Sequence, residues 1–266
     1  MVCVMRLVSF DPFRGSGLAN QFIKADAWLA HWPELTAADV ILYPESWQVA
    51  ILHHVLRKPL FPNLASYQLG YDKCLMTRAF QAVCPAHVPE THIVSAGEGT
   101  ADELIAHLGL PLVLKQPRHS MGRGVMLAES RRQLVDWCAK NPVVYAQEWL
   151  PCEADLRVVW VGRQIASAYW RRDGDGFHHN LAQGATVDFD NIPASALNLV
   201  STVATTLGVD HAGFDIIMID QFPMLLEFNV LFGNQALTAA GIDLKPIIRQ
   251  YLDDNYSPMA APPRAA

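Results

Sequence analysis

The sequence predicts an α/β protein in which a small parallel β-α-β unit precedes two regions of mixed helices and strands. Three observations support this class. In residues 1–70, short apolar runs alternate with segments of helical spacing, a pattern typical of a parallel sheet. In residues 71–146, helices and strands alternate around a polar, glycine-bearing loop at 118–124. Residues 147–255 are rich in strands and contain an acidic hairpin.

The first region gives the least specific signals. Gly15-Ser16-Gly17 follows the first strand, but Asn20 stands where a dinucleotide-binding fingerprint has its third glycine. We therefore interpret this segment as a loop that enters a helix. The expected strands are Val2–Phe10 and Asp39–Tyr43, the helices Gln21–Trp32 and Glu45–Leu56, and the connection Pro62–Gly70.

The later regions carry clearer start and stop signals. Ser130 is predicted to be an N-cap, and Gly208 is expected to end a helix in the left-handed conformation. Residues 256–266 are expected to form a frayed tail. The expected helices are Lys73–Val83, Thr100–Leu108, Arg131–Lys140, Ala194–Leu207 and Leu244–Asp253. The expected strands are Glu90–Val94, Leu112–Lys115, Val125–Ala128, Val143–Trp149, Leu156–Val161, Gln164–Trp170, Phe214–Ile219 and Met224–Phe228.

Composition limits the classes of function. The 266 residues are 51% apolar and 17% charged, which suits one large domain or two to three small ones that share a site. A net charge of −6 disfavours general nucleic-acid binding. No apolar stretch is long enough to span a membrane. Five cysteines without C-x-x-C spacing argue against a disulfide framework or a zinc site, and the expected location is the cytoplasm.

An acidic hairpin is the sharpest local feature. Asp215 and Glu227 each lie within a buried-strand pattern, where an unpaired carboxylate is costly. If the turn is centred on Gln221, these two residues lie directly opposite each other, with Cβ atoms about 5 Å apart. Glu227 and Asn229 share a strand face. Three oxygen donors would then converge, which suits Mg²⁺ shared with phosphates. The alternative is that both carboxylates face solvent on a half-exposed sheet.

Two groups of cations are candidates for binding an anionic ligand. Lys115 ends a strand and precedes the loop 118–124, whose glycines could bring backbone N–H groups close to phosphate. The next element is a strand, so this is not a Walker A loop and instead resembles a lid. An ordinary hairpin with surface cations is the alternative. The second group comprises Arg157, Arg171, Arg172, His178 and His179. The alternative for this group is that the side chains lie in solvent at the ends of strands and bind no ligand.

The order of the motifs is more specific than any one of them. Between about Tyr71 and Asp254 the chain resembles the ATP-grasp superfamily, and within it the RimK-like glutamate-ligase branch. The motifs that carry the resemblance are Asp72-Lys73, Pro89-Glu90-Thr91, Val113-Leu114-Lys115, Ser120-Met121-Gly122-Arg123-Gly124-Val125, Gln147-Glu148-Trp149-Leu150, Asp155-Leu156-Arg157, Arg171-Arg172, Asn180-Leu181, Ala212-Gly213-Phe214-Asp215, Leu226-Glu227-Phe228-Asn229 and Gly241-Ile242-Asp243.

This resemblance implies an ATP-grasp fold and a role for each matching residue. Lys73 and Lys115 would hold ATP phosphates, under a lid that includes Ser120, Gly122 and Gly124. The strand segment Gln147, Glu148 and Trp149 would read adenine, and Asp155 would contact ribose. Mg²⁺, or Mn²⁺, would be held by Asp215, Glu227 and Asn229. Arg171, Arg172 and Asn180 would face the transferred phosphate and the acceptor.

The implied reaction joins a carboxylate to an amine through an acyl-phosphate. The amine would be glutamate or another amino acid, and the carboxylate would belong to a coenzyme-like small molecule or a protein. Related ligases are often homo-oligomers. A phosphotransferase on the same fold and a non-catalytic ATP-binding regulator are the alternatives.

Three segments depart from the pattern of the branch. Asn229-Val230-Leu231-Phe232-Gly233 replaces Asn-x-Ser-Pro-Gly, and Phe177-His178 has histidine in place of arginine. Leu181-Ala182-Gln183-Gly184-Ala185 replaces Leu-His-Arg-Gly-Gly. These changes concern the acceptor side more than the ATP side, so the sequence leaves the identity of the amine open.

Overall fold

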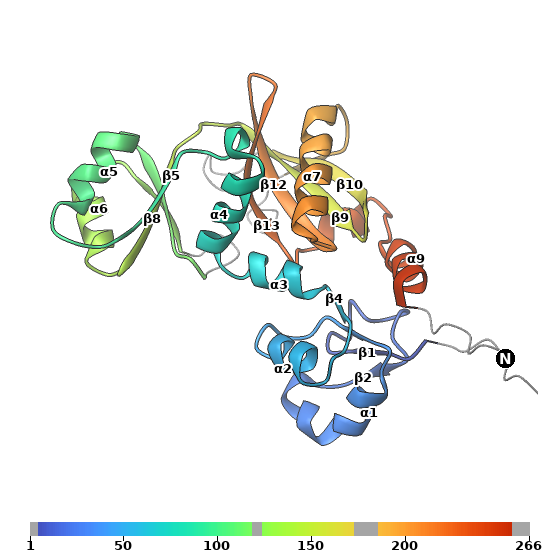
Figure 1. Ribbon diagram of the computed structural model, residues 1–266. Helices are drawn as coiled ribbons and strands as arrows, with labels where there is room; N and C mark the ends of the chain where they lie inside the picture. The colour runs from blue at the N-terminus through green and yellow to red at the C-terminus, as the bar shows by residue number, and fades with distance from the viewer. Residues whose placement is uncertain (1–4, 119–123, 173–185, 257–266) are drawn as a thin grey trace, which may run out of the picture.

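The strands of the protein form three sheets, which the chain builds in sequence order (Figure 1). The computed structural model describes residues 5–118, 124–172 and 186–256. We call the sheets N-terminal, middle and C-terminal. The predicted division after residue 146 falls inside a strand of the middle sheet, Val143–Glu148, and the division into domains stays a prediction.

The N-terminal sheet is parallel, as its alternating pattern predicts. Its strand order is β2-β1-β3-β4. The expected helix Gln21–Trp32 is wrong at its start, because residues 21–22 pair with Val8 and Ser9 as an edge strand. The loop with Gly15 and Gly17 therefore leads into a strand and not into a helix. The elements are β1 (Leu7–Ser9), β2 (Gln21–Phe22), the 3₁₀ helix η1 (Ala25–His31), α1 (Trp32–Ala37), β3 (Val40–Leu42), α2 (Val49–His54) and β4 (Leu60–Phe61).

The segment expected to be a connection is helical. Asn63 is the N-cap of α3 (Leu64–Gly70), and its side chain accepts a hydrogen bond from the Ser66 amide. This capping makes a helix out of a segment with weak periodicity. Helix α4 (Lys73–Val83) follows with the predicted bounds, and Asp72 is its N-cap.

The middle sheet is antiparallel, with the order β5-β8-β6-β7. Helices α5 and α6 cover one face around a core that includes Leu104, Leu114 and Leu134. The predicted N-cap Ser130 is confirmed, since it forms a capping box with Gln133. The elements are the 3₁₀ helix η2 (Pro85–His87), β5 (Thr91–Ser95), α5 (Thr100–Leu108), β6 (Leu112–Lys115), β7 (Val125–Ala128), α6 (Arg131–Cys138) and β8 (Val143–Glu148).

The C-terminal sheet is antiparallel, with the order β11-β10-β9-β12-β13. Helix α7 packs on one face, and Gly208 ends it with φ 67° and ψ 26°, as predicted. The elements are β9 (Ala154–Val161), β10 (Gln164–Arg172), β11 (Thr186–Asp188), α7 (Ala194–Leu207), β12 (His211–Ile219), β13 (Phe222–Asn229), α8 (Gln235–Ala239) and α9 (Lys245–Tyr256). None of the helices that the structure describes is long and apolar enough to cross a membrane.

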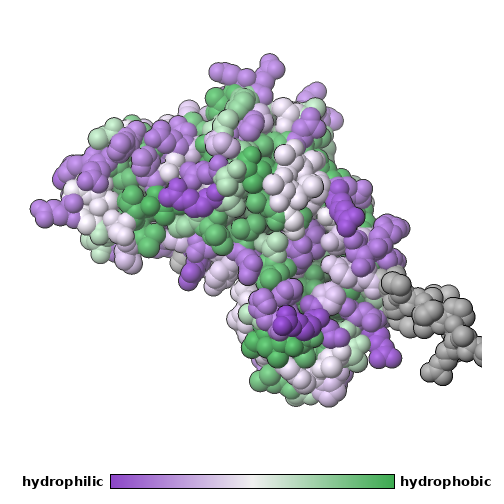
Figure 2. All heavy atoms as spheres, viewed as in Figure 1, coloured by the Kyte–Doolittle hydropathy of each residue, from purple (hydrophilic) through white to green (hydrophobic). Residues whose placement is uncertain are grey.

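Helix α2, beside the N-terminal sheet, has an exposed apolar face. Trp47, Ile51 and Val55 recur at intervals of four along α2 and its flanks and are exposed, whereas Leu52 is buried. Figure 2 shows apolar residues gathered over this helix. The predicted homo-oligomer stays a prediction.

Asp210 and His211 lie where the N-terminal sheet joins the C-terminal sheet. The Asp210 carboxylate accepts hydrogen bonds from the Asn63 amide (2.8 Å) and the Ser66 hydroxyl (3.0 Å). Next to it, His211 packs edge-on against Phe61 and Tyr43 and contacts the Val230 carbonyl at 2.8 Å. Both side chains are buried, so the charged form of each is disfavoured.

Burial shifts these two pKa values in opposite directions. It raises the pKa of Asp210 to about 7, although its hydrogen bonds favour the ionised form. It lowers the pKa of His211 to about 4. When the pH lies between the folded pKa of Asp210 and its ordinary pKa of 3.8, unfolding releases a proton from Asp210. When the pH lies between the folded pKa of His211 and its ordinary pKa of 6.5, unfolding adds a proton to His211. The two contributions to the pH dependence of stability therefore oppose each other from about pH 4 to about pH 6.5.

The variant Asp210→Asn should make this compensation visible. Relative to the wild type, the free energy of unfolding of this variant should rise more steeply from about pH 4 to about pH 6.5, because the proton release by Asp210 on unfolding is gone and the uptake by His211 remains. His211→Gln should show the reverse, a stability that falls relative to the wild type over the same range. Urea unfolding of the two variants and the wild type at several pH values measures this. Parallel pH profiles for all three proteins would contradict the assignment.

Candidate functional site

One face of the C-terminal sheet carries the apolar core under α7, and the other carries the charged side chains beside a second apolar cluster. Along β9, Leu156, Val158 and Trp160 belong to the core under α7. The residues between them point to the opposite face, because side chains alternate along a strand. That opposite face holds Asp155, Arg157, Arg171, Asp215, Glu227 and Asn229.

The predicted pairing of Asp215 with Glu227 is confirmed, but the turn and the register of the hairpin differ from those expected. The turn is the pair Asp220 and Gln221, both with positive φ (48° and 68°), so it is not centred on Gln221. A register shift then follows, since Ile216 pairs with residue 225 while Asp215 pairs with residue 227. The extra residue is a β-bulge that restores the opposition of the two carboxylates.

Two arginines bind the carboxylates of β9 and β12. Arg157 donates from Nε and Nη2 to the Asp215 carboxylate at 2.5 and 3.0 Å. Arg171 donates to both oxygens of Asp155 and, at 2.9 Å, to Asp215. All four residues are at most 8% exposed, so the charges neutralise one another within the protein. Burial disfavours the charged form of Arg171, but the carboxylates of Asp215 and Asp155 outweigh this and raise its pKa.

Glu227 faces lysines from the other half of the molecule. Its Oε2 lies 3.2 Å from Nζ of Lys73, at the start of α4. The Asn229 side chain donates at 3.3 Å to both Glu227 and Asp215. Burial opposes ionisation of Glu227, but the ammonium groups of Lys73 and Lys115 lower its pKa. The three predicted metal ligands therefore converge.

Lys115 is buried on the face of the middle sheet that α5 and α6 leave uncovered. Its Nζ lies 5.6 Å from the ring centroid of Tyr145, its direct partner across the β6–β8 pair. Burial lowers the pKa of Lys115 to about 8, against the attraction of Glu227. Lys115 therefore carries a positive charge at neutral pH in a nearly dry environment, where charge interactions are strong.

The base of the predicted lid is tied to the start of α4. The Lys73 amide donates to the Pro117 carbonyl at 2.9 Å, and Arg118 donates to the N-cap Asp72 at 3.0 Å. Across the loop, the Gln116 amide donates to the carbonyl of Gly124, which has φ 75°. The predicted lid residues Ser120 and Gly122 lie outside the described residues, as does Asn180.

The structure also places the predicted residues at the end of β8 and at the end of β10. The Gln147 side chain is buried and donates to Thr91 and Tyr145, and the Glu148 carboxylate accepts from the Glu90 amide. Trp149 follows β8 directly and is half-buried. Arg172 points away from Arg171, since it lies over the Trp170 ring and faces Asp188. The roles proposed for these residues, and the ribose role of Asp155, stay predictions.

Other residues of the site carry weaker signals in the sequence. Arg157 belongs to a recognised group of cations, but its pairing with Asp215 depends on the β9–β12 register. Tyr145 and Thr77 give no signal of their own, because an aromatic residue in a strand and a threonine in a helix are ordinary core residues.

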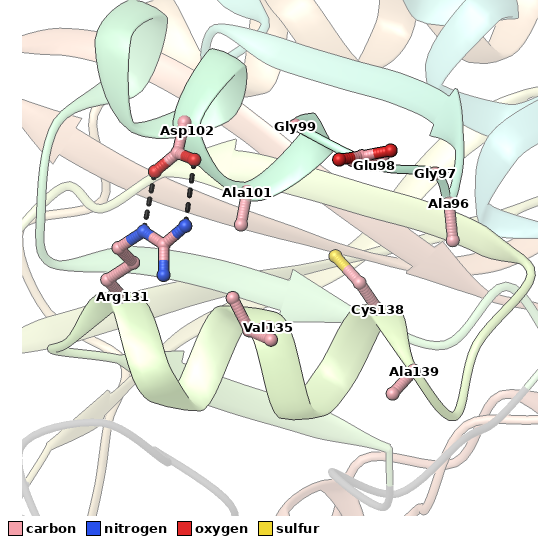
Figure 3. Close-up of a pocket in the computed structure, with 10 residues that line it drawn as sticks. All are labelled: Ala96, Gly97, Glu98, Gly99, Ala101, Asp102, Arg131, Val135, Cys138 and Ala139. Carbon is pink, nitrogen blue, oxygen red and sulfur yellow. Dashed lines mark hydrogen bonds and ion pairs between the residues drawn. The ribbon is translucent and has the colours of Figure 1, made fainter.

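A separate hollow lies outside this charged region (Figure 3). It has a volume of about 430 Å³ and lies between α5 and α6 of the middle sheet, with the ion pair of Asp102 and Arg131 on one side. None of its lining residues is a predicted site residue. The hollow therefore has no part in the charged site.

The donors at Asp215, Glu227 and Asn229 suit a hard cation. Within the parts of the chain that the structure describes, no three His, Cys, Asp or Glu side chains group closely enough to hold a metal by themselves. Two carboxylates and one amide are instead what Mg²⁺ uses when phosphate oxygens and water complete its coordination. The four cysteines in the described residues are free thiols, and Cys3 lies outside them.

Comparison with known proteins identifies the fold and the family. The structure is similar to a RimK domain ATP-grasp protein of Sphaerobacter thermophilus, with a TM-score of 0.67 and 20% identity over 92% of this chain and 98% of that one. The fold is therefore that of the ATP-grasp proteins, as the sequence predicts. The model of the RimK-like ATP-grasp domain matches residues 72–252, which is more than half of the chain.

Relatives in sequence carry ligase names. A "Probable alpha-L-glutamate ligase" of Enterobacter sp. (strain 638) is 29% identical over 215 residues, 74% of this chain and 71% of that protein. A "Ribosomal protein bS6--L-glutamate ligase" of Salmonella paratyphi B is 29% identical over 181 residues, 64% of this chain and 60% of that protein. The chain belongs to the RimK-like ATP-grasp family, whose members are ADP-forming carboxylate–amine ligases.

We expect that a residue larger than glycine does not fit at position 213, beside the Arg157 side chain. A Cβ atom there would lie 2.9 Å from Cδ and Nη1 of Arg157 and 3.1 Å from Cγ of Phe232. Because Arg157 is fixed by Asp215, it cannot move away, and Gly213→Ala should lower the free energy of unfolding by about 1–3 kcal/mol. Gly233→Ala is the matched control, since a Cβ added there would have no described residue within 4 Å apart from its neighbours in the chain. Equal stability of the two variants in urea unfolding would contradict the prediction.

Proposed function

We propose that this chain binds Mg²⁺-ATP between the charged face of the C-terminal sheet and the lysines of α4 and β6, and that it ligates an amino acid to a carboxylate. One observation carries the proposal. Two carboxylates and an amide suited to Mg²⁺ converge with an excess of cationic side chains, three of which are buried. Four cationic side chains, Lys73, Lys115, Arg157 and Arg171, face three carboxylates, those of Asp155, Asp215 and Glu227.

The excess of positive charge suits a polyphosphate. Lys73 and Lys115 each supply a point charge on a flexible stem, and both lie near Glu227. Asp215, Glu227 and Asn229 would hold Mg²⁺, which offsets charge on phosphate oxygens when bound. Gln147, Glu148 and Trp149 would then lie near the adenine, at the end of β8. The loop that follows Arg118 would cover the phosphates.

The chemistry follows from these positions. When bound, ATP supplies a γ-phosphoryl group to the carboxylate substrate, and the amine displaces phosphate from the acyl-phosphate, so ADP and phosphate are released. Arg171 carries a charge that its two carboxylate partners stabilise. In this proposal it would face the transferred phosphate and offset the negative charge that develops there. Exclusion of water by the loop would protect the acyl-phosphate from hydrolysis.

Glutamate is the first candidate for the amine. The similar proteins of Enterobacter and Salmonella are named for L-glutamate ligation, and the second is named for a ribosomal protein as acceptor. A protein carboxylate and a coenzyme-like carboxylate are therefore both suitable acceptors to test. The departures at Leu231-Phe232 and in residues 177–185 concern this side of the site, so other amino acids belong in the same test.

ADP release should depend on both an acceptor and an amine. We expect release from Mg²⁺-ATP when a carboxylate and an amino acid are both present, measured with a panel of carboxylates with and without glutamate and other amino acids. ADP with a phosphorylated product and no amine would indicate a phosphotransferase. Binding of ATP without ADP release across the panel would favour a regulator.

Glu227→Gln should abolish ADP release and keep the fold. The substitution removes one charge from the metal site and preserves the shape of the side chain. Asp253→Asn is the matched control, because Asp253 pairs with Arg249 of the same helix, at 3.0 Å, and is not a predicted site residue. Undiminished ADP release by Glu227→Gln would refute the metal assignment.

Lys115→Ala should weaken ATP binding and remove a pH dependence. In the wild type, ATP affinity should fall as pH rises through about 8, because the ammonium group loses its proton there. The variant should bind ATP about tenfold or more weakly and show no such fall. Titration calorimetry over that pH range measures both effects. An unchanged affinity would refute the role of Lys115.

A further inference from the structure

Tyr145 is the buried aromatic residue against which the Lys115 ammonium rests. It is 1% exposed and pairs directly with Lys115 across the antiparallel β6–β8 register. Nζ of Lys115 lies 5.6 Å from the ring centroid, within the range in which a cation is attracted by the negative face of an aromatic ring.

The hydroxyl of Tyr145 fixes the ring at its far end. It lies 2.8 Å from Oγ1 of Thr77 on α4, and it accepts a hydrogen bond from Nε2 of Gln147 at 3.2 Å. Gln147 also donates to Oγ1 of Thr91 at 2.8 Å, and Thr91 donates to the Pro89 carbonyl. This chain of hydrogen bonds connects β8 to both α4 and β5, so the ring cannot tilt without straining the two hydrogen bonds of its hydroxyl.

A fixed ring would limit the movement of the Lys115 side chain. A lysine has a long flexible stem, and here it is desolvated and repelled by Lys73. Glu227 attracts both ammonium groups, and it would draw Lys115 toward itself if nothing opposed this. The ring of Tyr145 supplies a second attraction from the strand next to Lys115. An aliphatic residue would fill the same space but offer no such attraction to the cation.

We propose that Tyr145 is a positioning residue that places the Lys115 ammonium for contact with the phosphates of the nucleotide. The inference rests on the proposed function, since it takes Lys115 as a phosphate ligand. Tyr145 acts through Lys115 and does not itself touch the nucleotide. Thr77 and Gln147 hold its ring in place.

A double-mutant cycle tests whether Tyr145 acts through Lys115. Tyr145→Leu and Tyr145→Phe are made in the wild type and in Lys115→Ala, and the affinity for Mg²⁺-ATP is measured by calorimetry. Tyr145→Leu should weaken binding about tenfold, and Tyr145→Phe, which keeps the ring, about two- to threefold. In the Lys115→Ala background both should change the affinity less than about twofold.

Two further variants separate positioning from stability. Tyr67→Phe removes another buried hydroxyl, which donates to the Pro44 carbonyl at 2.6 Å. This control should lower the unfolding temperature and leave ATP affinity unchanged. If Tyr145→Leu does not fold, Thr77→Val takes its place in the cycle, because it removes a partner of the Tyr145 hydroxyl. It should weaken binding about threefold only when Lys115 is present.

Additive effects in the cycle would overturn the inference, because Tyr145 would then act without Lys115. Additive effects together with amine-dependent ADP release by the wild type would leave the proposed function in place. A wild-type protein that binds no Mg²⁺-ATP would overturn both.

Discussion

The ion pairs of β9 with its two neighbours are the interaction on which the C-terminal sheet depends. Arg157 lies directly opposite Asp215, and Asp155 lies directly opposite Arg171, so each pair joins adjacent strands. A single charge at any of these positions would be expensive to bury, and removal of one partner from such a pair typically costs about 3–5 kcal/mol. The charges therefore fix the register of three strands, and the same charges form the floor of the site. Stability and chemistry cannot be varied independently here.

The bulge in β13 allows one strand to supply residues both to the core and to the charged face. Leu225 and Phe228 both belong to the core, although they are three residues apart and a regular strand would place them on opposite faces. The extra residue between them changes the phase, so that Glu227 and Asn229 reach the charged face while the apolar residues stay in the core. Without it, the two-residue turn would place residue 226 opposite Asp215. The carboxylate pair therefore exists because the strand is irregular.

Periodicity and caps predicted the elements that have strong local signals. Lys73–Val83, Thr100–Leu108 and Ala194–Leu207 have the predicted bounds, because each has a clear apolar stripe or an unambiguous end. Residues 21–22 and α3 were misassigned, since a two-residue edge strand is made by its partner and a capped two-turn helix has little periodicity of its own. The Asp215–Glu227 pair was predicted from a turn centre that is wrong by half a residue. The partners of Arg157 and Tyr145 depend on register, which no single segment contains.

Neither half of the site is balanced in charge by itself. On the C-terminal sheet, Arg157 and Arg171 bind the carboxylates of Asp155 and Asp215. Among the described residues of this sheet, no cation is then left for Glu227. That partner comes from α4, where Lys73 meets Glu227, with Lys115 of the middle sheet close by. The two lysines in turn repel each other and need the carboxylate. Attraction across the two sheets therefore brings together groups that would each be unfavourable alone, and it leaves one positive charge in excess. An anionic ligand that enters here meets charges already desolvated and held in place, so little of its binding energy is spent on ordering them.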